Sequence, residues 1–226
     1  MSPLVIVHVA AGSVGLASGA AAMIARKGGR THRAAGQVFF GSMLVMGGLG
    51  AAIAAATPDR ITTLAGILTV YLVATGWMTA RRPAGQSGRF EAAALALAML
   101  LAVSGFIIGW LGSQDPRGLI DGLPFQAAVV FATVATIAAV SDLIVLRRGG
   151  VTGPTRLARH LWRLSAALTI ASSAFFLGQQ KVMPAYMRGS PLLYLPVLAP
   201  LLALIVWQVE LRLPRRRPQA LGFLKR

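Results

Sequence analysis

Three histidines, His8, His32 and His160, have the widest chemical repertoire of any side chains in this sequence. An imidazole can coordinate a metal through either ring nitrogen, and it gains or loses a proton near neutral pH. His32 lies beside Arg33 in the stretch RKGGRTHRAAG (26–36), and His160 lies in RHLWR (159–163). Because the chain has no cysteine, disulfides, thiolate metal sites and thiol nucleophiles are excluded.

His32 and His160 each begin an apolar segment, and we expect both to lie at the same depth and to share a ligand. In one interpretation they are the axial ligands of a single haem b, whose propionates pair with Arg33 and Arg163. In another, the basic and imidazole groups hold a quinone, a lipid headgroup or another anion. The simplest alternative is that both histidines cap helix starts and bind no ligand.

A divalent metal is a further possibility, with His32, His160, Asp142 and Glu210 as its ligands. Against it, a carboxylate such as Asp142 inside an apolar helix must be paired or protonated. We therefore expect Asp142, and Glu210 likewise, to form an ion pair with an arginine from a neighbouring helix end. We expect segments 35–56, 124–146, 161–180 and 192–211 to converge on one layer, which also contains Arg163.

A second candidate site lies at the opposite end of the predicted bundle. His8 could join Gln179 and Gln180 there, together with Met183 and Met187. Two thioethers and an imidazole suit copper(I), although the loop carries no repeated methionine motif. This outer group remains separate from His32 and His160, which the predicted topology places about one membrane thickness away.

The amino-acid composition indicates which elements position these residues. Of the 226 residues, 56% are hydrophobic and only 12% are charged. Soluble domains carry about a quarter charged residues, and a membrane-spanning helix needs roughly 20 mainly apolar ones. The sequence therefore predicts an all-α, polytopic transmembrane helical bundle over residues 1–213, followed by a basic cytoplasmic tail at 214–226. Its seven expected spans are 3–25, 35–56, 61–80, 91–112, 124–146, 161–180 and 192–211.

The basic residues predict how this bundle is oriented. Eighteen of the 22 lysines and arginines fall in alternate connections and the tail, and the other connections contain four. Because basic loops stay in the cytoplasm, we expect the N-terminus outside and the C-terminus in the cytoplasm of a bacterial inner membrane. The same distribution explains the net charge of +16 without nucleic acid. The expected partners are the lipid bilayer and its anionic headgroups, and homo-oligomerisation stays open.

Several stretches resemble a family of uncharacterised bacterial integral membrane proteins, classified only as a domain of unknown function. They are HVAAG (8–12), RKGGRTHRAAGQVFFGSML (26–44), YLVATGWMTARR (71–82), RHLWRL (159–164) and FFLGQQKVMP (175–184). The HR…G and RHLWR segments are the most specific of these. The resemblance implies a helical inner-membrane protein that carries His8, His32 and His160 together, and it implies no activity.

Three functions remain open from the sequence. The first is a cofactor- or ligand-binding bundle, for haem or quinone and electron transfer, with its site at the cytoplasmic end. The second is a small-molecule transporter, and the third is an accessory structural protein without catalysis. An enzyme is disfavoured, because no Ser-His-Asp or Gly-x-Ser-x-Gly pattern accompanies the histidines.

Overall fold

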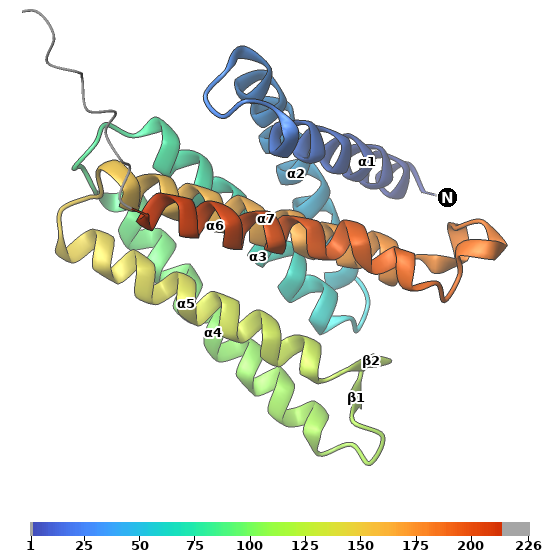
Figure 1. Ribbon diagram of the computed structural model, residues 1–226. Coiled ribbons are helices and arrows are strands. Elements are labelled where there is room, and N and C mark those ends of the chain that lie inside the picture. The colour runs from blue at the N-terminus through green and yellow to red at the C-terminus, as the bar shows by residue number, and fades with distance from the viewer. Residues whose placement is uncertain (1, 214–226) are drawn as a thin grey trace, which may run out of the picture.

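The computed structural model describes residues 2–213, in which seven α-helices run back and forth along one another (Figure 1). The expected basic tail at 214–226 lies outside the described residues. The helices are α1 (Pro3–Ile24), α2 (Arg30–Ala55), α3 (Arg60–Arg81), α4 (Arg89–Ser113), α5 (Gln126–Arg147), α6 (Gly153–Ser172) and α7 (Leu195–Arg212). A two-residue hairpin, β1 (Leu119–Ile120) and β2 (Leu123–Pro124), joins α4 to α5.

Local chemistry accounts for where these helices begin. Pro3 occupies the first turn of α1 behind Ser2, whose side chain accepts from the Val5 amide. The Asp59 carboxylate caps α3 by accepting from the Thr62 amide at 2.9 Å. Gly28, at φ +76°, makes the tight turn between α1 and α2 that a residue with a Cβ would disfavour.

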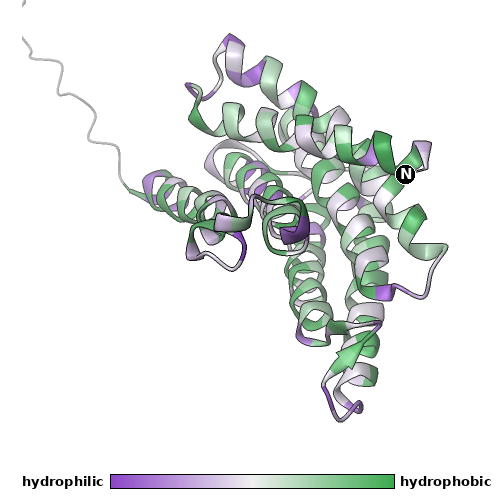
Figure 2. Ribbon diagram, turned by 90° about the vertical axis from the view of Figure 1, so that its right-hand side faces the viewer, coloured by the Kyte–Doolittle hydropathy of each residue, from purple (hydrophilic) through white to green (hydrophobic). Residues whose placement is uncertain are grey.

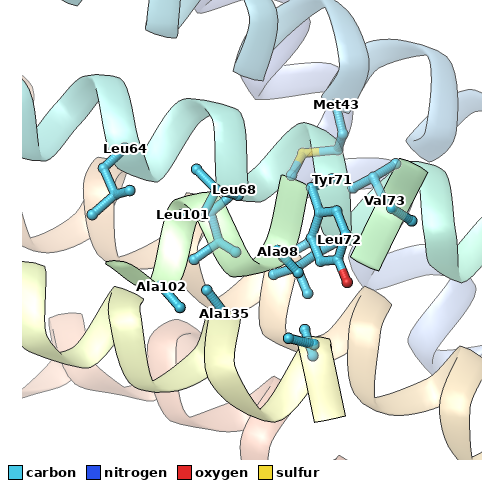
Figure 3. Close-up of a cluster of buried hydrophobic side chains, with 14 of the residues drawn as sticks. Met43, Leu64, Leu68, Tyr71, Leu72, Val73, Ala98, Leu101, Ala102 and Ala135 are labelled. Atoms are coloured by element: carbon cyan, nitrogen blue, oxygen red, sulfur yellow. The ribbon is translucent and has the colours of Figure 1, made fainter. Parts of the chain in front are cut away.

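Helices α3 and α6 form the centre of the bundle. Helix α3 packs against α2, α4, α5 and α6, and α6 packs against α3, α7 and α1. In Figure 1 the α1–α2 pair lies on one side of them and the α4–α5 pair on the other. Figure 3 shows part of the apolar core around α3, where Met43 of α2 and Leu72 lie beside Tyr71.

Six helices are long and apolar enough to cross a membrane, namely α1 to α5 and the segment 191–212. Apolar residues cover most of their length, and hydrophilic residues gather toward the helix ends (Figure 2). The expected seventh span, 161–180, is not among them. Helix α6 begins earlier, at Gly153, and carries Arg156, Arg159 and Arg163. After Ser172 it continues as a π-helix, Ser173–Leu177, and then breaks into short 3-10 turns.

The alternating helix directions bring the basic connections to one end of the bundle (Figure 1). Helices α1, α3, α5 and α7 finish there, and α2, α4 and α6 begin there. The connection at 82–88 touches the one at 148–152, where the Gly85 amide donates to the Val151 carbonyl at 3.2 Å. We call this the basic end. It contains both His32 and His160.

Candidate functional site

A cavity of about 450 Å³ opens at the basic end between α1, α2, α3, α6 and α7. His32 on α2 and His160 on α6 both line it, as the sequence predicted from their common depth. Its volume falls within the range of small-molecule and cofactor pockets, roughly 300–1,000 Å³. We call it the basic-end cavity.

Each of the two imidazoles is held by a carbonyl from a neighbouring helix. His32 Nδ1 lies 2.9 Å from the Ala22 carbonyl of α1, and His160 Nδ1 lies 2.9 Å from the Gly76 carbonyl of α3. Because a carbonyl only accepts hydrogen bonds, Nδ1 must carry the proton in both rings. Nε2 is then the remaining nitrogen, and in a neutral ring it presents a lone pair. Histidines that ligate metals have this arrangement.

Apart from the two histidines, the charged side chains that line the cavity are basic. Lys27, Arg33 and Arg81 line it, and among the residues of 2–213 that form its wall there is no Asp or Glu. Partial burial lowers the pKa of the Lys27 ammonium, because desolvation disfavours its charged form. This surplus of positive charge favours an anionic ligand.

Two tryptophans give the cavity flat apolar surfaces next to these charges. The Lys27 ammonium lies 4.0 Å from the Trp207 ring centroid, and the Arg81 guanidinium lies 4.6 Å from that of Trp77. Trp77 also stacks on Phe40, with ring centroids 4.4 Å apart. The cation–π contacts place each charge over the face of its ring, so charge and aromatic surface occupy the same wall.

Gly36 leaves part of the cavity wall open. It lies one turn after His32 on α2, and a Cβ added to it would meet no atom within 4 Å. Gly41, farther along the same helix, is equally open but does not line the cavity. The position therefore has room for a Cβ, and a larger side chain at Gly36 would extend into the cavity.

Behind α6, on the side away from the cavity, lies a buried ion-pair cluster. Asp142 of α5 pairs with Arg163 at 2.7 Å and with Arg159, and both arginines come from α6. The Tyr71 hydroxyl of α3 donates to the other Asp142 oxygen and accepts from Arg163 at 3.0 Å. All four side chains are less than one-tenth exposed. The ion pair expected for Asp142 is confirmed, and we call these residues the arginine network.

Smaller polar groups complete the arginine network. Arg159 donates to Ser141 at 2.7 Å and to Thr79 at 3.1 Å, and Arg163 donates to Thr75. Near it, Arg156 donates at 2.7 Å to the carbonyls of residues 79, 80 and 82, at the carboxyl end of α3. These carbonyls have no partners within the helix, so α6 supplies their cap.

The geometry corrects the expected composition of the site. Arg163 does not line the cavity and cannot pair with a ligand there, because it is enclosed by Asp142 and Tyr71. Helix α5 is also absent from the cavity wall, where α1 and α3 take its place. The cause is rotation about α6: at 100° per residue, Arg159 and Arg163 share one face of the helix, whereas His160 and Leu164 share another.

The four-residue metal site is not assembled. Asp142 is occupied by the arginine network, and Glu210 is exposed, with no ion pair to another residue of 2–213. Within that range no three His, Asp or Glu side chains gather as metal ligands. The two imidazoles are therefore the only members of the expected set that share a cavity.

The outer candidate group is also separated in the structure. His8 Nδ1 lies 2.8 Å from the Met46 carbonyl of α2, and its ring packs against Gly50. Gln180 instead accepts from the Gly189 amide at 2.8 Å within its own loop, and Gln179 is exposed. Among the described contacts, no hydrogen bond joins His8 to either glutamine.

Sequence reasoning did not identify Lys27, Trp77, Arg81 and Trp207 as cavity residues. Trp77 and Arg81 are four residues apart on α3, a spacing that places them on one helix face. The sequence contains this signal, but only the packing of α3 against α2 and α6 turns that face toward the histidines. The chain matches no protein-family model, no curated protein and no solved structure, so its function has to be argued from the cavity.

Proposed function

We propose that this is a multi-pass protein of the bacterial inner membrane that binds an anionic amphiphile in the basic-end cavity. Its amino terminus would lie outside and its basic end in the cytoplasm, as the distribution of lysine and arginine favours. Cofactor or ligand binding is then its activity, rather than catalysis by a nucleophile.

The observation that carries the proposal is the pairing of charge and aromatic surface in one cavity. Lys27, Arg33 and Arg81 supply three cations, and Trp77 and Trp207 supply flat apolar walls. A ligand that satisfies both has an anionic group and a flat, apolar body. A free phosphate would leave the aromatic walls uncovered, and a neutral hydrocarbon would leave the cations unpaired.

The net charge behind the cavity wall supports the same ligand class. The arginine network contains two guanidinium groups and one carboxylate, so it adds about one positive charge on the far side of α6. In a low-dielectric interior such a charge acts over a longer distance than in water. It therefore adds to the attraction for an anion at His160.

Fluorescence in nanodiscs of phosphatidylcholine tests this proposal. The probe is anthroyloxystearate, an anionic amphiphile with an aromatic body, and its methyl ester is the neutral control. We expect saturable energy transfer to the probe from the tryptophans that line the cavity, and at least about tenfold weaker binding of the ester. Equal binding of acid and ester would overturn the proposal.

Two glycine variants provide the matched comparison. Gly36→Leu fills the cavity, whereas Gly41→Leu adds the same side chain to an exposed, open position of the same helix. We expect the first to abolish saturable transfer and the second to preserve it. If both variants bind the probe as the wild type does, the ligand does not occupy this cavity.

A further inference from the structure

We infer that the ligand of the basic-end cavity is an iron porphyrin of the haem b type, bound by Nε2 of His32 and Nε2 of His160. The inference rests on the proposed function and names its ligand class. It depends on three properties of the cavity. These are the imidazole nitrogen that has no hydrogen-bond partner, the number of side chains that could ligate a metal, and the charge and polarity of the lining residues.

The free nitrogen decides between a metal and a hydrogen-bonding ligand. Both Nδ1 atoms already donate to the carbonyls of Ala22 and Gly76. Nε2 of a neutral imidazole has a lone pair and no proton, so it cannot donate to a quinone carbonyl or a carboxylate. The cations Lys27, Arg33 and Arg81 disfavour a further positive charge on either ring. Both histidines line one cavity and each has Nε2 left without a proton, an arrangement that suits a metal centre.

The number of donors decides what kind of metal centre fits. Within residues 2–213 no third His, Asp or Glu joins these two. A bare zinc ion takes four ligands in a structural site and three protein ligands in a catalytic one. Two imidazoles alone satisfy neither. A porphyrin brings four nitrogens of its own to the iron and leaves two axial positions, which is the number that the protein supplies.

The side chains that line the cavity suit the flat ring and the anionic propionates of such a cofactor. The macrocycle is flat and apolar, which suits the apolar lining residues Leu161, Leu164 and Leu168, and its two propionates are anionic. Arg33 and Arg81 can pair with the propionates from the rim, in place of the expected Arg163. The open space at Gly36 lies directly after His32 and leaves room for the edge of the ring.

The test is haemin added to the purified full-length protein in phosphatidylcholine nanodiscs. We expect one equivalent to give a six-coordinate, low-spin spectrum, with sharp visible bands after reduction by dithionite. His32→Ala and His160→Ala should each remove one axial ligand, abolish the low-spin spectrum and weaken binding at least about tenfold.

His8→Ala is the matched control. His8 makes the same Nδ1–carbonyl contact, at 2.8 Å from the Met46 oxygen, but it does not line the cavity. This variant should keep the wild-type spectrum. A five-coordinate spectrum in the wild type, or a low-spin spectrum that survives both cavity histidine variants, would overturn the inference. If an alanine variant does not fold, Gly36→Leu provides the second test, because it should block haemin while leaving both histidines in place.

Metal-free protoporphyrin separates this inference from the proposed function. It has the same anionic edge and flat body but no iron, so we expect it to bind the wild type and both histidine variants similarly. Binding of this probe that Gly36→Leu abolishes, without a low-spin haemin spectrum, overturns haem ligation and leaves the amphiphile site intact. Failure of the anthroyloxystearate experiment overturns the proposed function itself.

Discussion

Removing the Asp142 carboxylate should destabilise this bundle more than removing either arginine that pairs with it. Asp142 is fully buried and accepts hydrogen bonds from Arg159, Arg163 and Tyr71. In Asp142→Asn two guanidinium groups, 6% and 0% exposed, lose their only counter-charge. Breaking one buried ion pair costs about 3–5 kcal/mol, and this change breaks two, so we expect a loss of about 4 kcal/mol or more.

Arg163→Met should be milder because it leaves a neutral pair. Arg159 and Asp142 remain together, and the lost interactions are the ion pair of Arg163 with Asp142 and its hydrogen bonds to Tyr71, Thr75 and the Ala138 carbonyl. We expect a loss of about 2 kcal/mol. The double variant Asp142→Asn/Arg163→Met should lose less free energy of unfolding than the two single losses add up to, by at least about 1 kcal/mol.

The assay is unfolding in mixed micelles with increasing sodium dodecyl sulfate, followed by tryptophan fluorescence. Trp162 is a local reporter, since its ring centroid lies 5.2 Å from the Arg163 guanidinium. Glu210→Gln, at an exposed carboxylate of the same end, is the control and should change the free energy of unfolding by less than about 0.5 kcal/mol. The reasoning is wrong if Asp142→Asn matches this control, or if Arg163→Met is the more destabilising change.

Two further predictions concern a helix contact and the outer loop. Gly66→Ala should destabilise by about 1–3 kcal/mol, because its Cβ would lie 2.8 Å from the Ala51 amide nitrogen, whereas Gly48→Ala meets open space and should be neutral or stabilising in the same assay. Hydrogen bonds from Arg60 lower the pKa of Asp121, so their stabilisation should be present above about pH 4 and lost as pH falls through the lowered value. That loss should stay below about 1 kcal/mol, because Arg60 is half exposed, and Asp121→Asn should remove this acid step.

Hydropathy predicted most of the fold because six helices within residues 2–213 are long and apolar enough to cross a membrane. An apolar stretch of sufficient length has few alternatives to a spanning helix. The span expected at 161–180 is not confirmed, because α6 begins earlier, at Gly153, and carries buried arginines. Arg159 and Arg163 make its amino-terminal part polar, and only the distant Asp142 explains how they can be buried. A hydropathy average over α6 includes the two arginines but takes no account of the Asp142 carboxylate with which they pair.

The two histidines could be placed together from depth alone, but their surroundings could not. Depth follows from the position of a residue in its span, so His32 and His160 were predicted to lie at one level. Which side chains face them depends on the rotation of each helix about its axis, and the sequence leaves that open. At 100° per residue Arg163 lies about 60° around α6 from His160, which is enough to place it in the arginine network instead of the cavity wall.

The arginine network and the basic-end cavity are two faces of one helix, and this explains why so polar a segment lies at the centre of the bundle. A buried ion pair adds little stability relative to well-packed apolar residues, but it has one satisfactory geometry. With Arg159 and Arg163 bound to Asp142, α6 cannot rotate without leaving charges unpaired. His160 lies on the same rigid turn, held in addition by the Gly76 carbonyl. The ligand site that we infer at His32 and His160 would need that fixed orientation more than it would need a stronger core.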